Sequence, residues 1–137
     1  MTDHLLDSGI LIRHLRDQRD YVALVDRLSD EGDLFIASFT RLEIVRGMRK
    51  RERQDTFELM DSMFTLPMDH IIADQAGELI QSWRTRGITL GDADAVIAAS
   101  AIAYELDLIT TNARHFPMPE LTVWQADEVG NLSIYEH

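Results

Sequence analysis

Three carboxylates, far apart in the sequence, each stand where a short apolar run gives way to a helical pattern. They belong to Asp7, Glu43 and Asp94, and Asn112 ends a fourth apolar run in the same way. In an open α/β sheet, ligands bind at the carboxyl ends of the strands, so these side chains are predicted to converge there. Converged carboxylates are suited to holding Mg²⁺ or Mn²⁺ against a phosphate group.

Each of these carboxylates also has an ordinary structural role open to it. Asp7 is placed to cap a helix N-terminus, which is worth about 1 kcal/mol, and Glu43 forms the pattern of a capping box with Thr40. Asp94 falls in the first turn of a helix, where negative charge favours the macrodipole, and Asp92 is the more natural N-cap there. Capping explains each residue singly but does not predict that they converge. Because clustered acids without a cation raise one another's pKa and reduce stability, we favour a metal site.

The elements that position these residues follow from the spacing of the apolar side chains. An edge strand at most is expected at 65–68, because Pro67 donates no ladder hydrogen bond. Short apolar runs predict further strands at 4–6, 34–37, 108–111 and 121–123. Helical spacing predicts helices at 8–15 (with Ser8 as its cap), 22–28, 40–48, 57–64, 69–83 and 93–106.

Strands that alternate with helices imply right-handed crossovers and a parallel sheet. The expected fold class is therefore α/β, with a short central parallel sheet and helices on both faces in three layers. The 137 residues are enough for a single domain with its own core. The tail after Asp127 carries little pattern and is expected to be mobile.

Composition narrows the function classes. A net charge of −11 argues against a general nucleic-acid binder, because such binding depends on Lys and Arg neutralising phosphates. No apolar stretch approaches the roughly 20 residues that span a bilayer, so no membrane association is expected. The absence of cysteine from the sequence fits a reducing compartment, and the expected location is cytoplasmic.

The basic residues are unevenly distributed, which leaves two interpretations open. A solvated helix face and a phosphate contact both fit the cluster Arg46, Arg49, Lys50, Arg51 and Arg53. Lys50 is the only lysine, so no P-loop can be written.

The sequence does not support a serine or cysteine nucleophile or a zinc site. The sequence has no Gly-x-Ser-x-Gly elbow and no cysteine nucleophile, and its five histidines lack zinc-ligand spacing. His115 alone lies near a strand end in the relevant half of the chain, and a lone histidine is usually structural.

Four segments resemble the motifs of PIN-domain proteins. The third of them is the most specific, and the set covers nearly the whole chain in order and spacing. The length of the chain is similar to that of the VapC-type toxins of toxin–antitoxin pairs. The four segments are Leu5–Ile12, Thr40–Gly47, Asp94–Ala101 and Thr110–Phe116.

This resemblance implies a Mg²⁺-dependent endoribonuclease, with Mn²⁺ as a substitute, that a cognate antitoxin holds inactive. It implies metal ligation by Asp7, Glu43 and Asp94, with Asn112 orienting a water on the metal. RNA is the implied substrate, and Arg46, Arg49 or Arg84 would grip neighbouring phosphates. The resemblance also suggests a homodimer, and apolar helix positions near Leu11 and Leu28 would permit one.

Two positions depart from the family pattern. Gly9 replaces a residue that is often polar, so a local hydrogen bond is expected to be missing. His115 stands where the family often has an acid, which leaves a fourth carboxylate ligand in question. Asp92 is an extra acid, but its helical position sets it about 200° from Asp94, so it ranks low as a substitute.

Three rival functions remain. A response-regulator receiver also has an acidic Mg²⁺ pocket in a small α/β domain, but it needs a lysine at a late strand end, and Lys50 lies in the wrong half of the chain. A non-catalytic PIN module would use the same fold for binding only. A housekeeping PIN nuclease would cut RNA without an antitoxin.

Overall fold

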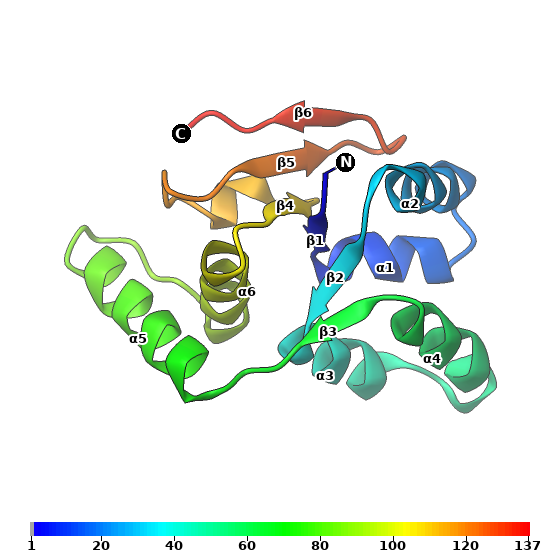
Figure 1. Cartoon of the computed structure of the whole chain (residues 1–137), viewed down its shortest axis with the longest axis horizontal. Helices are drawn as coiled ribbons and strands as arrows, with labels where there is room; N and C mark the ends of the chain where they lie inside the picture. The colour runs from blue at the N-terminus through cyan, green and yellow to red at the C-terminus, as the bar shows by residue number, and fades with distance from the viewer. Residues whose placement is uncertain (1) are drawn as a thin grey trace.

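A six-stranded sheet runs through the molecule in the order β3-β2-β1-β4-β5-β6 (Figure 1). The structure is a computed structural model and describes residues 2–137. The first five strands run parallel, and β6 pairs antiparallel with β5. The strands are β1 His4–Leu6, β2 Leu34–Ala37, β3 Phe64–Leu66, β4 Asp107–Thr110, β5 Val123–Ala126 and β6 Leu132–Ile134.

Helices cover both faces of this sheet, because successive strand residues point to opposite sides. Leu5 packs in a core with Ile97 of α6, whereas its neighbour Leu6 packs in a second core with Tyr21 of α2. The three-layer α/β class expected from the sequence is therefore confirmed. The helices are α1 Ser8–Leu15, α2 Arg19–Glu31, α3 Ser38–Gly47, α4 Arg53–Asp61, α5 His70–Arg84 and α6 Asp92–Ala103, with 3-10 turns η1 Lys50–Glu52 and η2 Ala113–His115.

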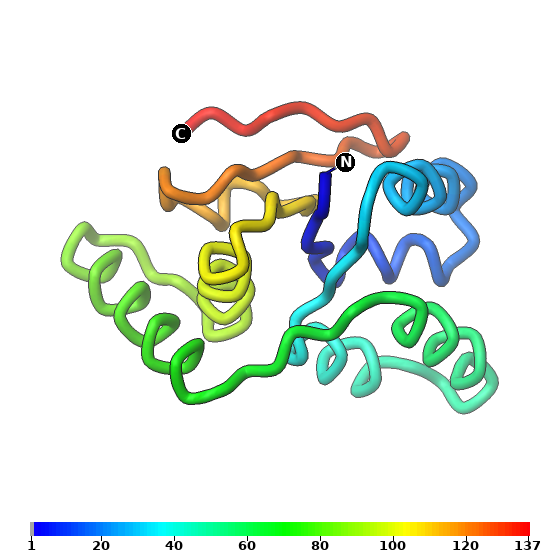
Figure 2. Tube along the Cα trace, viewed as in Figure 1, coloured from blue at the N-terminus to red at the C-terminus, as the bar shows by residue number. Residues whose placement is uncertain are grey.

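The path of the chain places β1 at a topological switch point. The chain starts at β1, builds outward through β2 to β3, and then crosses to the other side of β1 to form β4 and β5 (Figure 2). The carboxyl ends of β2, β1 and β4 are consequently adjacent, and such a switch point is where ligands bind in open α/β sheets. Among residues 2–137, no helix is both long and apolar enough to cross a membrane.

Several element boundaries differ from those expected. The helix that contains Thr40 starts two residues earlier, at Ser38, and Phe64 belongs to a strand rather than to the preceding helix. The strand expected at 121–123 lies at Val123–Ala126. The strand β6 was not expected: its antiparallel pairing with β5 places part of the tail after Asp127 in the sheet. Its three residues carry too little pattern to be recognised from the sequence.

Candidate functional site

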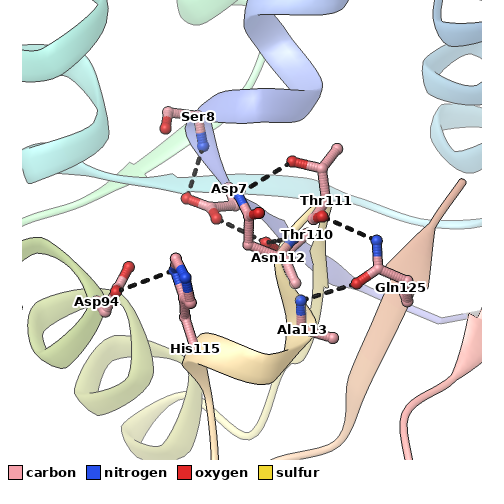
Figure 3. Close-up of polar contacts among 9 residues, drawn as sticks. All are labelled: Asp7, Ser8, Asp94, Thr110, Thr111, Asn112, Ala113, His115 and Gln125. Carbon is pink, nitrogen blue, oxygen red and sulfur yellow. Dashed lines mark hydrogen bonds and ion pairs between the residues drawn. The ribbon is translucent and has the colours of Figure 1, made fainter. Parts of the chain in front are cut away.

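Asp7 lies where β1 passes into α1, at the carboxyl edge of the sheet (Figure 3). Its Oδ1 accepts a hydrogen bond from the backbone N–H of Ser8 at 2.8 Å, and its Oδ2 accepts one from the hydroxyl of Thr110 at 2.7 Å. The residue is only 8% exposed, and these two bonds compensate for burying its charge. The sequence offered both Asp7 and Ser8 as the cap of α1, and Asp7 occupies the N-cap position.

Glu43 lies in α3, and the structure removes the capping role that the sequence offered it. The expected capping box is wrong, because Ala37 is the N-cap of α3 and Thr40 lies inside the helix. The Thr40 hydroxyl is buried without a hydrogen-bond partner. Glu43 is half-buried, and its carboxylate takes part in none of the ion pairs found among residues 2–137.

Asp94 lies in the first turn of α6 and faces a histidine. Its Oδ2 is 3.6 Å from Nδ1 of His115, which η2 brings across from the end of β4 (Figure 3). Gly91 is the N-cap of this helix, so the capping role expected for Asp92 is wrong. Asp92 is the first helical residue and is exposed.

The pKa values of Glu43 and Asp94 both respond to the charge of Asp7. Burial raises the pKa of Glu43, the charge of Asp7 raises it further, and Arg46 and Asp94 act in opposite directions on it. Burial is also the main cause of the raised pKa of Asp94, followed by the charge of Asp7, whereas His115 lowers it. The charge of Asp7 therefore disfavours ionisation of Glu43 and of Asp94, and Asp94 disfavours ionisation of Glu43, as expected for like charges.

The donor set of this site fits a hard divalent cation. All three candidate ligands offer carboxylate oxygens, and a bound cation would reverse the repulsion that raises the pKa of Glu43 and Asp94. Within residues 2–137, no three acidic or histidine side chains are close enough to form a complete ligand set by themselves. Mg²⁺ commonly takes one or two carboxylates and completes its shell with waters and substrate phosphates. The arrangement therefore fits an open Mg²⁺ site rather than a closed protein cage.

The remaining candidate residues divide into those near the carboxylates and those apart from them. Asn112 follows β4 and is exposed; its Nδ2 donates to Oγ1 of Thr111 at 3.4 Å (Figure 3). Arg46 is close enough to lower the pKa of Glu43. Arg49 points its Nε at Glu52, 3.9 Å away. Arg84 lies exposed in the last turn of α5 and does not influence these carboxylates.

Two residues at the site were not recognised from the sequence for what they do. Thr110 is fully buried, and its hydroxyl joins the two halves of the chain by donating to Asp7 and accepting from the backbone N–H of Asn112 at 3.0 Å. Gly9 is explained by space: a Cβ there would lie 2.6 Å from Oγ1 of Thr111. The only signal for Thr110 was its place at the end of an apolar run.

A groove opens beside Glu43, between α1, α3 and α4. It has a volume of about 160 Å³ and is lined by four apolar side chains, by Gly47 and by four polar side chains, which belong to Arg16, Glu43, Glu52 and Thr56. The apolar lining residues include Ile12, Leu15, Ile44 and Met48.

The apolar positions proposed for a homodimer are wrong. Leu11 and Leu28 are 0% and 2% exposed and belong to the core between the sheet and α2. Large apolar side chains that are exposed lie elsewhere, among them Leu42, Phe64, Met68 and Ile71.

Comparison with known families agrees with this fold. The family model for the PIN domain matches residues 4–119. The chain therefore belongs to the PIN-domain family.

Two curated relatives place it more narrowly. Ribonuclease VapC10 of Mycobacterium tuberculosis is 35% identical over 119 residues, covering 85% of this chain and 87% of the relative. Ribonuclease VapC19 of the same organism is 34% identical over 119 residues, covering 85% and 95%. Within the PIN-domain family, the chain is a VapC-type protein.

A solved structure supports the fold. The crystal structure of VapBC2 from Rickettsia felis, bound to a DNA fragment from its promoter, contains a chain that superimposes with a TM-score of 0.80. The match covers 92% of this chain and 100% of that one at 20% identity, a level that shows a shared fold.

The close approach at Gly9 yields a first testable prediction. Gly9→Ala should lower the free energy of unfolding by about 1–3 kcal/mol, because the new methyl group overpacks against Thr111. Adding Thr111→Ala should recover most of this loss, since it removes the oxygen that the methyl group meets. Urea unfolding of the single and double variants measures both effects. Gly77→Ala is the control, because a Cβ there meets no atom within 4 Å. Equal losses in the single and double variants would contradict the close-approach explanation.

The raised pKa values yield a second prediction. In metal-free buffer, stability should fall as pH rises above the ordinary carboxyl value of about 4 toward neutrality, because the unfolded chain ionises at these carboxyls more readily than the folded chain does. Asp94→Asn should reduce this fall, since it removes one acid and relieves Glu43. The measurement is urea unfolding across that pH range.

The exposed neighbour Asp92 supplies the control for this prediction. Asp92→Asn makes the same chemical change two residues away and should keep the wild-type dependence on pH. If Asp94→Asn and Asp92→Asn behave alike, the carboxylates are not coupled in the folded protein.

Proposed function

We propose that this protein is a Mg²⁺-dependent endoribonuclease and the toxin of a toxin–antitoxin pair. The observation that carries the proposal is the position of Asp7 at the end of β1, Glu43 in α3 and Asp94 in the first turn of α6, where the charge of Asp7 raises the pKa of both Glu43 and Asp94. Relatives 34–35% identical to this chain are named ribonucleases, which supports RNA as the substrate. Mn²⁺ would substitute for Mg²⁺, because it accepts the same oxygen ligands.

In this proposal, Asp7, Glu43 and Asp94 hold the cation, and their side chains are held in place to different degrees. Asp7 is fixed in orientation by its hydrogen bonds to Ser8 and Thr110. The cation, when bound, supplies positive charge against the phosphate and makes the attacking water more acidic. Glu43 has no competing ion pair among the described residues and is free to turn to the cation.

Two further side chains would act on the substrate. The amide of Asn112 is exposed at the site and would orient the water or a phosphate oxygen. Arg46, one turn beyond Glu43, would bind a neighbouring phosphate. The net charge of −11 penalises indiscriminate RNA binding, so a shaped target is expected.

The groove beside Glu43 supports a peptide inhibitor. Its lining combines four apolar side chains with the carboxylates of Glu43 and Glu52, so it suits an amphipathic tail that sets a basic residue against Glu43. The VapBC complex of Rickettsia felis shares this fold, which supports an antitoxin as the partner. A cytoplasmic location and a homodimer belong to the same proposal.

The proposal predicts that cleavage depends on metal and on the carboxylates. The purified protein should cut a structured RNA with Mg²⁺ or Mn²⁺ and stop when EDTA is added. Asp7→Asn, Glu43→Gln or Asp94→Asn should each lower cleavage by more than the roughly 10- to 100-fold typical of losing a supporting partner of a metal ligand. Gel assays of a labelled RNA measure this. Cleavage that persists in EDTA would overturn the metal mechanism.

A melting series separates metal binding from cleavage. Mn²⁺ should raise the melting temperature in a concentration-dependent way, because it binds the folded state alone. Asp94→Asn should stabilise the metal-free protein modestly and abolish the response to Mn²⁺. An equal Mn²⁺ shift in both proteins would place the ion elsewhere.

The partner proposal is tested in cells. Expression of the chain alone should slow growth, and co-expression of the product of its neighbouring gene should restore it. Met48→Glu should prevent this rescue, because a charge would replace one of the apolar side chains of the groove. Leu42→Glu is the control, since Leu42 is 51% exposed and lies outside the groove. If the neighbouring product does not bind, the protein is a housekeeping nuclease or a binding module.

A further inference from the structure

The segment that carries Asn112 and His115 is held in place by a side chain from the next strand. Gln125 lies on β5 and is the register partner of Thr110, the last residue of β4. Its Oε1 accepts a hydrogen bond from the backbone N–H of Ala113 at 2.8 Å, and its Nε2 donates to the carbonyl oxygen of Thr111 at 2.9 Å (Figure 3). The amide therefore grips the backbone on both sides of Asn112.

Both N–H donors of the Gln125 amide are used, because its second donor bond goes to the carbonyl oxygen of Ala126 at 2.8 Å. Its oxygen accepts from Ala113. A half-buried side chain that makes these three bonds is fixed in one orientation. Gln125 is thus a rigid bridge between β5 and the segment that follows β4.

This bridge replaces a cap that the segment itself lacks. The first N–H groups of a helical turn have no partner within the turn, and the side chain of Asn112, at the N-cap of η2, makes no capping bond. Gln125 supplies the missing acceptor for Ala113, the first residue of η2. The turn that begins there carries His115 to within 3.6 Å of Asp94.

Together with Thr110, the bridge pins three consecutive residues. The hydroxyl of Thr110 accepts from the N–H of Asn112 and donates to Asp7, while Gln125 holds Thr111 and Ala113. We propose that Gln125 is a positioning residue of the nuclease site: it holds the backbone around Asn112 and thereby keeps Asn112 and His115 beside Asp7 and Asp94. This inference rests on the proposed nuclease function.

The principal variant is Gln125→Met, which keeps the length of the side chain and removes all three hydrogen bonds. Hydrogen exchange of residues 111–116 in the metal-free protein should become roughly tenfold faster, as expected for losing ordinary hydrogen bonds. The kcat for RNA cleavage should fall about 10- to 100-fold with KM within about twofold, because a small misplacement slows the reaction without weakening binding. Gln54→Met is the matched control, since it removes an exposed amide bond to Glu58 on α4.

A second variant guards against misfolding of the first. Gln125→Glu retains an acceptor for Ala113 but turns an acceptor toward the carbonyl oxygens of Thr111 and Ala126. Because that carboxylate oxygen is repelled by both carbonyl oxygens, exchange in residues 111–116 should again be faster, and kcat lower, than in wild type.

The outcomes separate this inference from the proposed function. Wild-type exchange in residues 111–116, or wild-type kcat in both Gln125 variants, would overturn it and would mean that the buried Ala113 and Phe116 suffice to anchor the segment. A uniform rise in exchange along the whole chain would also overturn it, as a loss of global stability. If the wild-type protein cuts no RNA, the nuclease proposal fails. The hydrogen-exchange measurement alone then tests whether Gln125 holds residues 111–116 in place.

Discussion

Repulsion between three carboxylates at one edge of the sheet is the constraint to which the surrounding structure responds. Burial and the charge of Asp7 both raise the pKa of Glu43 and Asp94, so ionising these two acids in the folded state opposes folding. The site itself supplies only part of the compensation, through His115 beside Asp94. The rest comes from the two apolar cores on either face of the sheet, in which Leu5 and Leu6, the residues just before Asp7, are both completely buried.

The order of the strands in the sheet places the site residues at one edge. Because β1 lies between β2 and β4, the residues that follow these three strands meet at one edge although they are far apart in sequence. The backbone N–H of Asp7 donates to the carbonyl oxygen of Ile109 at 3.0 Å. This backbone hydrogen bond fixes the position of Asp7 relative to β4. The hydroxyl of Thr110, one residue further along β4, then fixes the direction of its carboxylate. Sheet register and acid orientation are therefore set by the same strand pair.

The extent to which this could be predicted depends on how local each signal is. Apolar runs and helical spacing were enough for the α/β class, for strands β1 and β2, and for the helix α5. The capping roles of Thr40 and Asp92 were wrong, because helix α3 starts two residues before Thr40, and Gly91 rather than Asp92 takes the N-cap position of α6. The roles of Thr110 and Gln125 depend on which strands are neighbours, and no short stretch of sequence contains that information. Gly9 is of the same kind, since its reason lies 102 positions away, at Thr111.

The three acids are held to different degrees, and this difference bears on how one site can both fold and bind a cation. Asp7 is buried and hydrogen-bonded at both oxygens, so it is a fixed point. Asp94 has a histidine at 3.6 Å, which offsets part of the repulsion without closing the carboxylate off. Glu43 has no ion-pair partner among the described residues and remains free to move on a long side chain. Three rigid acids would leave the metal-free protein with repulsion it could not relax. One fixed acid, one offset by a neighbour and one that can turn away allow the empty site to relieve its repulsion and the occupied site to close on the cation.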